Sequence, residues 1–170
     1  LRLSKATSLF GRPTFRKYLG ILEALAPNRN LLDVGAATGA FINEARKCGW
    51  HAEGIEISEA AVKEAKKMKR PVRLGTLADI KSDEQFGVIT MLDVFEHLND
   101  PTQTLEEAKE HLLPNGILAM NLPDAGSVTA QILGMRWPMI IPPEHLFYYN
   151  RKNMTKLLEK KELKRKEGRW

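Results

Sequence analysis

The chain has 170 residues, a length typical of one domain, and 43% of them are apolar, which is too many for a disordered protein. The single cysteine, Cys48, excludes an internal disulfide. No apolar run reaches the ~18–20 residues of a membrane-spanning helix, and no signal-peptide pattern opens the chain. The net charge of +5 arises at the end of the chain, because residues 151–170 hold nine Lys or Arg and three Asp or Glu. We therefore expect one cytoplasmic domain over 1–170, with no nucleic-acid partner.

Hydrophobic periodicity predicts short strands that alternate with helices of about ten to thirteen residues, as in βαβ units with a parallel sheet. Thr38 and Ser58 are the expected N-caps of two helices, and Gly49 is an expected helix stop. In chain order the predicted elements are helix 13–26, strand 30–35, helix 38–48, strand 51–57, helix 58–69, strands 72–75 and 86–92, helix 101–113, a turn over 114–116, strand 117–121, helix 124–135, a Pro- and aromatic-rich connection over 136–150, helix 151–160 and a last strand over 162–170. The sequence therefore predicts an α/β, Rossmann-like, doubly wound and mostly parallel sheet with helices on both faces.

A glycine-bearing turn follows the first predicted strand, over residues 33–39 (DVGAATG). Open α/β sheets bind ligands beyond the carboxyl ends of their strands, and glycines there let the backbone approach a ligand closely. Glu56 ends the second strand, 21 residues after Gly35, where an acid is placed to accept hydrogen bonds from ribose hydroxyls. The turn and the acid together favour an adenosine-containing ligand.

The spacing of the glycines argues against a dinucleotide. That fingerprint requires glycines at the first, third and sixth positions, which here are Gly35, Ala37 and Ala40. The turn is also preceded by an acid, Asp33, which would oppose a pyrophosphate but suits a ligand with an ammonium or sulfonium group. No phosphate-binding loop that ends in Lys and Ser or Thr is present. A cationic adenosine derivative fits these residues best.

Residues 31–41 (LLDVGAATGAF) resemble the first motif of class I S-adenosylmethionine-dependent methyltransferases, which usually have a third glycine where Ala37 stands. The similar segments that follow in family order are 54–58, like the ribose-binding acidic loop; 77–79, like the adenine-contacting segment; 92–101, like the motif after strand four in the small-molecule branch that includes ubiquinone-biosynthesis O-methyltransferases; 113–117, like the turn into strand five; and 142–150, like the His-aromatic segment of that branch. The family sheet has a seventh, antiparallel strand for which no sequence remains. We therefore expect that strand to be missing and the domain to be truncated at one or both ends.

The resemblance implies that the chain binds S-adenosylmethionine and releases S-adenosylhomocysteine. Backbone at Gly35 and Gly39 would contact the methionine portion, and Asp33 would orient its amino group. Glu56 would bind the ribose and Asp79 the adenine amine. The implied cofactor-binding set is Asp33, Gly35, Ala36, Ala37, Gly39, Glu56, Ile57, Asp79, Leu92 and Asp93. Leu92 and Asp93 would lie beside the reacting methyl group.

The resemblance also implies a small-molecule acceptor, methylated at oxygen. His97 and His145 are candidate general bases, although a structural hydrogen-bonding role suits each equally well. Arg16 is a weaker candidate for the cofactor carboxylate, because a solvated helix arginine is the simpler interpretation. We expect no metal site, and we expect His51 and His111 to be exposed.

Three alternatives stay open at this point. The first is a methyltransferase-like domain that binds cofactor without turnover, the second is an RNA methyltransferase, and the third is a nucleotide-dependent oxidoreductase. The Asn-Pro-Pro-Tyr type motif of nucleic-acid and protein amine methylation is absent after the fourth predicted strand. The aromatic residues over 137–149 form either a lid over a small acceptor or a satellite core under a long loop.

Overall fold

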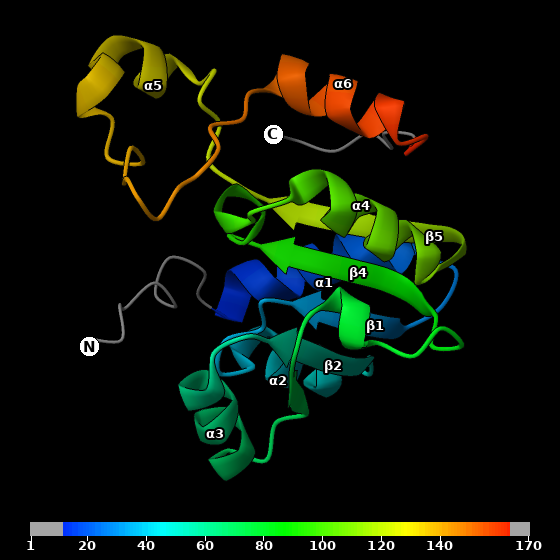
Figure 1. Ribbon diagram of the computed structural model, residues 1–170. Coiled ribbons are helices and arrows are strands. Elements are labelled where there is room, and N and C mark those ends of the chain that lie inside the picture. The colour runs from blue at the N-terminus through cyan, green and yellow to red at the C-terminus, as the bar shows by residue number, and fades with distance from the viewer. Residues whose placement is uncertain (1–11, 164–170) are drawn as a thin grey trace. The chain divides into compact units, whose positions relative to one another are not determined.

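The computed structural model describes residues 12–163, which fall into two compact units (Figure 1). One unit comprises the chain up to Met91 together with Ala108–Ala119, and the other comprises Leu92–Glu107 together with the chain from Met120 onward. Within residues 12–163, none of the helices combines the length and the hydrophobicity that a membrane span requires. The first unit contains most of the sheet, and the second contains the segments that follow strands β4 and β5.

The sheet has five strands in the order β3-β2-β1-β4-β5. The strands are β1 (Asn30–Val34), β2 (His51–Glu56), β3 (Val72–Leu74), β4 (Phe86–Leu92) and β5 (Leu112–Asn121). Strand β1 pairs in parallel with β2 and β4, β2 pairs in parallel with β3, and the arrows of β4 and β5 point the same way in Figure 1. The strand order reverses direction between β1 and β4, which is where sheets of this kind bind ligands. The predicted Rossmann-like α/β class is confirmed.

The helices alternate with the strands largely as the hydrophobic pattern predicts. They are α1 (Arg12–Leu25), α2 (Ala40–Lys47), α3 (Glu59–Lys67), α4 (Pro101–Glu110), α5 (Val128–Leu133) and α6 (Arg151–Lys160), with short 3-10 helices η2 (Leu77–Asp79), η3 (Phe95–His97) and η4 (Gly134–Arg136). Ser58 is the N-cap of α3, as expected, because its hydroxyl accepts a hydrogen bond from the Ala61 N–H at 3.3 Å. Gly49 follows α2 with a φ of 83°, the left-handed conformation that ends helices.

The predicted N-cap of α2 is wrong. The helix begins at Ala40, and Gly39 occupies the cap position with a φ of 71° and no side-chain cap. The reason is local: the Gly39 N–H donates to the Ala36 carbonyl at 2.8 Å, so residues 36–39 form a turn before the helix starts. Thr38 therefore belongs to the glycine turn.

The boundary between α4 and β5 also differs from the prediction. The helix ends at Glu110 and the strand starts at Leu112, so the predicted turn over 114–116 lies inside β5. The Phe86 N–H donates to the His111 carbonyl at 2.8 Å, which joins the start of β4 to the chain before Leu112. Asn115 takes a φ of 63° within the strand. The turn-type residues Pro114, Asn115 and Gly116 therefore lie within the strand and not between α4 and β5.

The predicted helix over 124–135 is shorter than expected, and the predicted last strand is largely undescribed. Helix α5 starts at Val128, because the Ser127 hydroxyl caps it by accepting from the Ala130 N–H at 3.2 Å. Asp124 instead accepts a hydrogen bond from the Gly126 N–H at 2.8 Å, which keeps the chain before Ser127 in a turn. The predicted final strand lies outside the described residues over 164–170, and Glu162 continues a turn after α6. The single-domain boundary of 1–170 stays a prediction.

Close packing between β2 and the glycine turn positions the candidate site. Helices α1 and α2 pack together through the rings of Phe15 and Phe41, whose centroids lie 5.2 Å apart. A Cβ atom added at Gly54 in β2 would lie 2.5 Å from both the Ala36 Cβ and the Ile42 Cδ1. Gly54 therefore allows the turn after β1 and the start of α2 to approach β2 closely.

The close approach at Gly54 predicts that Gly54→Ala lowers the free energy of unfolding by about 1–3 kcal/mol, the usual cost of overpacking. Gly20→Ala is the matched control, because Gly20 lies in α1 with no atom within 4 Å of its added Cβ. Alanine at that helical position should be neutral or should stabilise by about 0.5–1 kcal/mol. Urea unfolding of both variants measures the difference, and equal effects would contradict the packing argument.

Candidate functional site

The turn after β1 is built from left-handed backbone. Gly35, Ala37 and Gly39 have φ values of 70°, 47° and 71°. The N–H groups of Gly35 and Ala36 donate to the Ile55 carbonyl at 2.9 and 3.0 Å, which fixes the turn against the end of β2. Ala37 thus takes a conformation that glycine adopts without cost, in agreement with the third glycine that the resemblance expects at this position.

Glu56 links this turn to the loop after β2. Its Oε2 accepts a hydrogen bond from the Ala37 N–H at 2.8 Å, and its Oε1 accepts from the Ser58 N–H at 2.9 Å. A carboxylate has about four lone-pair sites, so each oxygen keeps one for a further donor such as a ribose hydroxyl. The adjacent Ile57 side chain is 75% exposed and offers an apolar surface next to this charge. Glu56 and Ile57 together suit a ligand that has hydroxyl groups beside a flat apolar ring.

Asp33 is buried beneath the turn. Its Oδ1 accepts a hydrogen bond from the Thr90 hydroxyl at 2.6 Å, and Thr90 lies opposite it in the register of β1 and β4. Burial raises the pKa of Asp33 to about 7, the Thr90 hydrogen bond opposes this rise, and the charge of Glu56 adds to it. Burial, and then the charge of Asp33, raise the pKa of Tyr18 to about 12. Two acids at one end of the sheet favour a cationic ligand.

Two other predicted cofactor residues have protein partners. The Asp79 Oδ2 accepts hydrogen bonds from the Thr76 N–H at 2.8 Å and the Thr76 hydroxyl at 3.0 Å, and these hold the pKa of Asp79 below its usual range. Asp79 therefore caps η2, and its contact with adenine stays a prediction. The Arg16 Nε donates to the Glu44 Oε1 at 2.8 Å, which agrees with the simpler interpretation of a helix arginine.

Leu92 and Asp93, which belong to the second unit, follow β4 directly. Asp93 has a φ of 55° and is held by Asn121 through two hydrogen bonds. The Asp93 N–H donates to the Asn121 carbonyl at 2.9 Å, and the Asn121 Nδ2 donates to the Asp93 Oδ1 at 2.6 Å. Asn121 and Thr90 were not among the predicted site residues, although each is a polar residue in a predicted strand.

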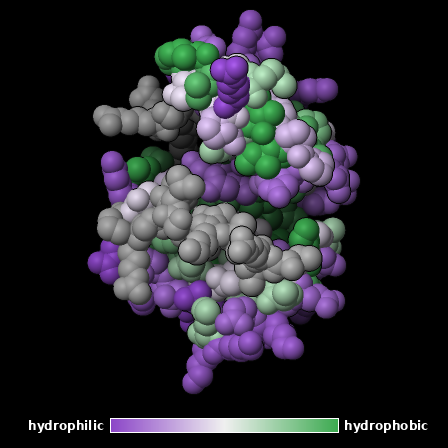
Figure 2. Space-filling model, turned by 90° about the vertical axis from the view of Figure 1, so that its left-hand side faces the viewer, coloured by the Kyte–Doolittle hydropathy of each residue, from purple (hydrophilic) through white to green (hydrophobic). Residues whose placement is uncertain are grey.

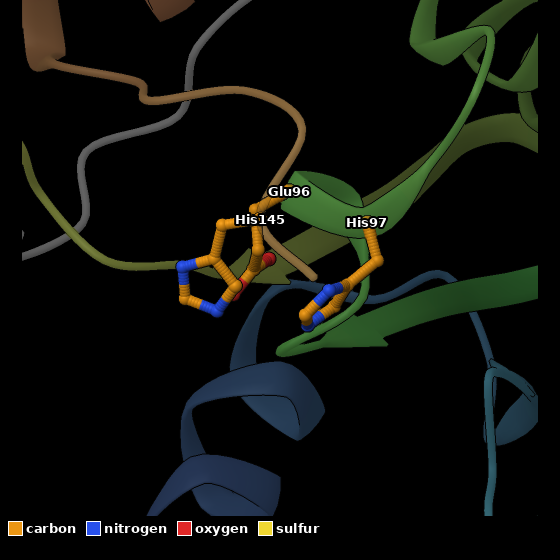
Figure 3. Close-up of side chains that lie close together, drawn as sticks. All are labelled: Glu96, His97 and His145. Atoms are coloured by element: carbon orange, nitrogen blue, oxygen red, sulfur yellow. The ribbon is translucent and has the colours of Figure 1, made fainter. Parts of the chain in front are cut away.

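The structure brings the two candidate bases together (Figure 3). The rings of His97 and His145 meet edge to face with centroids 4.8 Å apart, and one ring nitrogen of each and a Glu96 carboxylate oxygen lie within 4.8 Å of one another. The His97 Nδ1 is 2.6 Å from the Glu144 carbonyl oxygen. Because a carbonyl oxygen only accepts, Nδ1 carries a proton, and the acceptor nitrogen of a neutral His97 ring is then Nε2.

Of the two histidines predicted to be exposed, only His51 is, and part of the aromatic connection lies in a core. His51 is exposed, as expected, but His111 is buried, because its Nδ1 contacts the Glu84 carbonyl at 3.0 Å beside the start of β5. Tyr149 is buried against Phe95, with ring centroids 5.2 Å apart, so this part of the connection belongs to a core.

Apolar side chains of α5 and η4 are exposed on the second unit. Green surface gathers in the upper part of Figure 2, at the height of α5 in Figure 1. The exposed apolar residues of these two elements are Val128, Ile132, Leu133 and Met135. The second unit therefore combines a small aromatic core with an apolar surface.

The fold and the glycine turn after β1 are those of the class I S-adenosylmethionine-dependent methyltransferases. A family model described as a methyltransferase domain matches residues 10–164, so the chain belongs to this methyltransferase family. A ubiquinone biosynthesis O-methyltransferase from Pasteurella multocida is 28% identical over 107 residues, which cover 53% of this chain and 44% of that protein. One from Pelagibacter ubique is 28% identical over 97 residues, or 54% of this chain and 40% of that protein. The chain thus spans less than half the length of these relatives.

Solved structures agree on the fold. A possible histamine N-methyltransferase from Thermotoga maritima has a TM-score of 0.68 at 23% identity, covering 89% of this chain and 72% of its own. The magnesium protoporphyrin IX methyltransferase of Synechocystis, with bound S-adenosylhomocysteine, also has a TM-score of 0.68, at 15% identity over 88% of this chain and 71% of its own. The cofactor of this family is S-adenosylmethionine, as the sequence motifs predict.

The raised pKa of Asp33 predicts how stability depends on pH. Between the ordinary aspartate pKa of 3.8 and the folded value of about 7, the folded chain binds a proton that the unfolded chain has lost. The free energy of unfolding should therefore fall as pH rises through this window, by up to about 4 kcal/mol, and level off above it. Asp33→Asn should remove this dependence, whereas Asp83→Asn, at an exposed position, should keep it. Urea unfolding across this pH range measures the effect, and a parallel pH dependence in Asp33→Asn would contradict it.

Proposed function

We propose that this chain binds S-adenosylmethionine at the turn after β1 and transfers its methyl group to a hydroxyl oxygen of a small molecule. The main support for this cofactor site is the Glu56 carboxylate, which accepts hydrogen bonds from the N–H groups of Ala37 and Ser58. This arrangement holds the turn and the acidic end of β2 together. The choice of oxygen is supported by relatives named ubiquinone biosynthesis O-methyltransferases, of which the chain spans less than half.

The donor set fits this cofactor in charge and in shape. When bound, S-adenosylmethionine supplies a methyl group on a positively charged sulfur. The leaving group is the neutral sulfide that remains after methyl transfer. Asp33 and Glu56 provide negative charge for the cationic methionine portion and acceptors for the ribose hydroxyls. Left-handed backbone at Gly35 and Gly39 lets main-chain atoms approach the ligand, and the exposed Ile57 offers an apolar contact for a purine. The protein's main contribution to such a displacement is alignment and exclusion of water.

His97 is the proposed general base on the acceptor side. Its Nε2 can take the proton of the acceptor hydroxyl, because its Nδ1 proton is already engaged by the Glu144 carbonyl. As the acceptor O–H bond breaks, the new O–C bond forms and the C–S electron pair goes to sulfur. The His145 ring packs edge to face against the His97 ring.

A turnover assay tests the reaction. The full-length protein is incubated with methyl-labelled S-adenosylmethionine and, in parallel, with a catechol probe such as 3,4-dihydroxybenzoate, a native metabolite extract and total RNA, and products are read by mass spectrometry. A label on a small-molecule oxygen supports the proposal. A label on RNA, or cofactor binding without label transfer to any acceptor, overturns it in favour of the alternative concerned.

The role of Glu56 predicts weaker cofactor binding in Glu56→Gln. Loss of charged hydrogen bonds to the ribose should cost roughly 10–100-fold in affinity for S-adenosylhomocysteine, as measured by calorimetry. Glu59→Gln is the matched control, since Glu59 is exposed in the first turn of α3. Unchanged affinity in Glu56→Gln, or binding of NAD in place of S-adenosylhomocysteine, would refute the site.

The role of His97 predicts slower turnover in His97→Gln with cofactor affinity retained. Loss of a general base lowers kcat typically by about 10²–10⁴-fold. His51→Gln, at an exposed position of β2, should match the wild type. The assay is label transfer to the acceptor identified above, and an undiminished kcat in His97→Gln would exclude it as the base.

A further inference from the structure

Thr90 is the polar side chain of an otherwise apolar strand. In β4, which reads FGVITML, it is the residue that carries a hydrogen-bonding side chain, and it is 0% exposed. A buried hydroxyl is costly unless it is hydrogen-bonded. The Thr90 hydroxyl donates to the Asp33 Oδ1 at 2.6 Å, and the register of β1 and β4 places the two residues opposite each other. Thr90 therefore satisfies its own hydroxyl by binding an acid of the neighbouring strand.

The contact leaves the second oxygen of Asp33 available. Asp33 is 4% exposed, and within residues 12–163 the Thr90 hydroxyl is the one donor that forms a hydrogen bond with its side chain. The other oxygen, Oδ2, is not among the enclosed polar atoms that lack a partner. An ionised carboxylate accepts hydrogen bonds at both oxygens. Oδ2 can therefore accept from a ligand while Thr90 holds Oδ1.

The groups that face Asp33 in the described part of the chain provide no positive charge. Glu56 approaches it from the end of β2 and Tyr18 from α1. Burial raises the pKa of Asp33 to about 7, the Thr90 hydrogen bond opposes this rise, and the charge of Glu56 adds to it. Burial, and then the charge of Asp33, raise the pKa of Tyr18 to about 12, so Tyr18 stays neutral. Among the described residues, an ionised Asp33 thus has a neutral donor and a like charge beside it, and no cation.

We propose that Thr90 is a positioning residue of the cofactor site, whose hydroxyl holds the Asp33 Oδ1 so that the ionised carboxylate offers Oδ2 to the ammonium group of the cofactor. This inference rests on the proposed function, in which S-adenosylmethionine binds at the turn after β1. The hydrogen bond has two effects. It fixes the direction of the Asp33 side chain, and it stabilises the ionised form, which burial and the charge of Glu56 disfavour. Thr90 acts through Asp33 and needs no contact of its own with the ligand.

A purely structural pair is the competing interpretation. A hydroxyl and a carboxyl group can satisfy each other between two buried strands without any ligand, and loss of the hydroxyl would then lower stability alone. The two interpretations differ in their pH dependence, because only the ionised acid attracts a cation. The ionised fraction of Asp33 changes near neutral pH, so the difference between the interpretations is measurable.

The test measures the affinity of the full-length protein for S-adenosylhomocysteine, which carries the same ammonium group, by calorimetry from about pH 6 to pH 8.5. Thr90→Val keeps the branched shape and lacks the hydroxyl, so Asp33 should ionise at a higher pH than in the wild type. At the acid end the variant should bind roughly tenfold more weakly, which is the worth of one hydrogen bond to a charged group. The difference should shrink at the alkaline end, where Asp33 is ionised in both proteins. The amino group of the ligand titrates equally in both measurements and cancels in their ratio.

Further variants control for folding. Thr90→Ser keeps the hydroxyl and should restore the wild-type pH profile. Ile89→Val shortens a neighbouring buried side chain of β4 without removing a hydrogen bond, so it should lower stability and leave the profile unchanged. Thr90→Ala also lacks the hydroxyl and carries the same expectation if Thr90→Val does not fold. Equal weakening at every pH, or no weakening at the acid end, would overturn the proposal.

Unfolding in urea separates this inference from the proposed function, because it needs no ligand. The folded Asp33 keeps a proton that the unfolded chain loses, so stability falls as pH rises to about 7 in the wild type. In Thr90→Val this fall should continue to a higher pH, and in the double variant with Asp33→Asn it should disappear. A shifted unfolding profile in a chain that binds no S-adenosylhomocysteine would refute the proposed function and the ammonium contact, and would leave Thr90 a stabiliser of ionised Asp33 alone.

Discussion

The absence of a side chain at Gly54 is the constraint on which the cofactor side of the structure depends. The turn after β1 takes its shape from left-handed backbone at Gly35, Ala37 and Gly39, but backbone shape alone does not place it. The turn is held where it is because two of its N–H groups reach the Ile55 carbonyl. That reach requires the chain at Ala36 to pass within contact distance of β2, in the space that a Cβ of Gly54 would fill.

The packing of the turn against β2 also determines where the two acidic side chains, Glu56 and Asp33, lie. Glu56 ends the same strand, and its carboxylate satisfies N–H groups on both sides of the gap between turn and loop. Asp33 ends up beneath them, out of water, with the Thr90 hydroxyl as its partner and the Glu56 charge nearby. A buried acid beside a second acid resists ionisation until a cation arrives. The site is thereby suited to a positively charged adenosine derivative, and a pyrophosphate would meet two like charges.

Local signals allowed the sequence to predict much of this fold, and non-local contacts explain where it did not. Ser58 caps α3 because the signal for a cap lies within three residues of it. Thr38 also has a hydroxyl side chain, but the Gly39 N–H donates to the Ala36 carbonyl, so the residues around Thr38 form a turn. His111 is buried because its ring nitrogen contacts the Glu84 carbonyl, 27 residues away in the sequence. Thr90 and Asn121 matter through partners 57 and 28 residues away, which one sequence does not reveal.

The two units each contain a buried carboxylate, and the difference between them indicates different tasks. The Asp33 Oδ1 accepts a hydrogen bond from the neutral Thr90 hydroxyl, so part of its hydrogen-bonding capacity is met without a ligand. Among the described residues the Glu96 Oε2 has no such donor, and a ring nitrogen of His97 and one of His145 lie within 4.8 Å of a Glu96 carboxylate oxygen. The proposed cofactor contacts at Asp33 and Glu56 thus lie in the first unit, and the proposed base, His97, lies in the second.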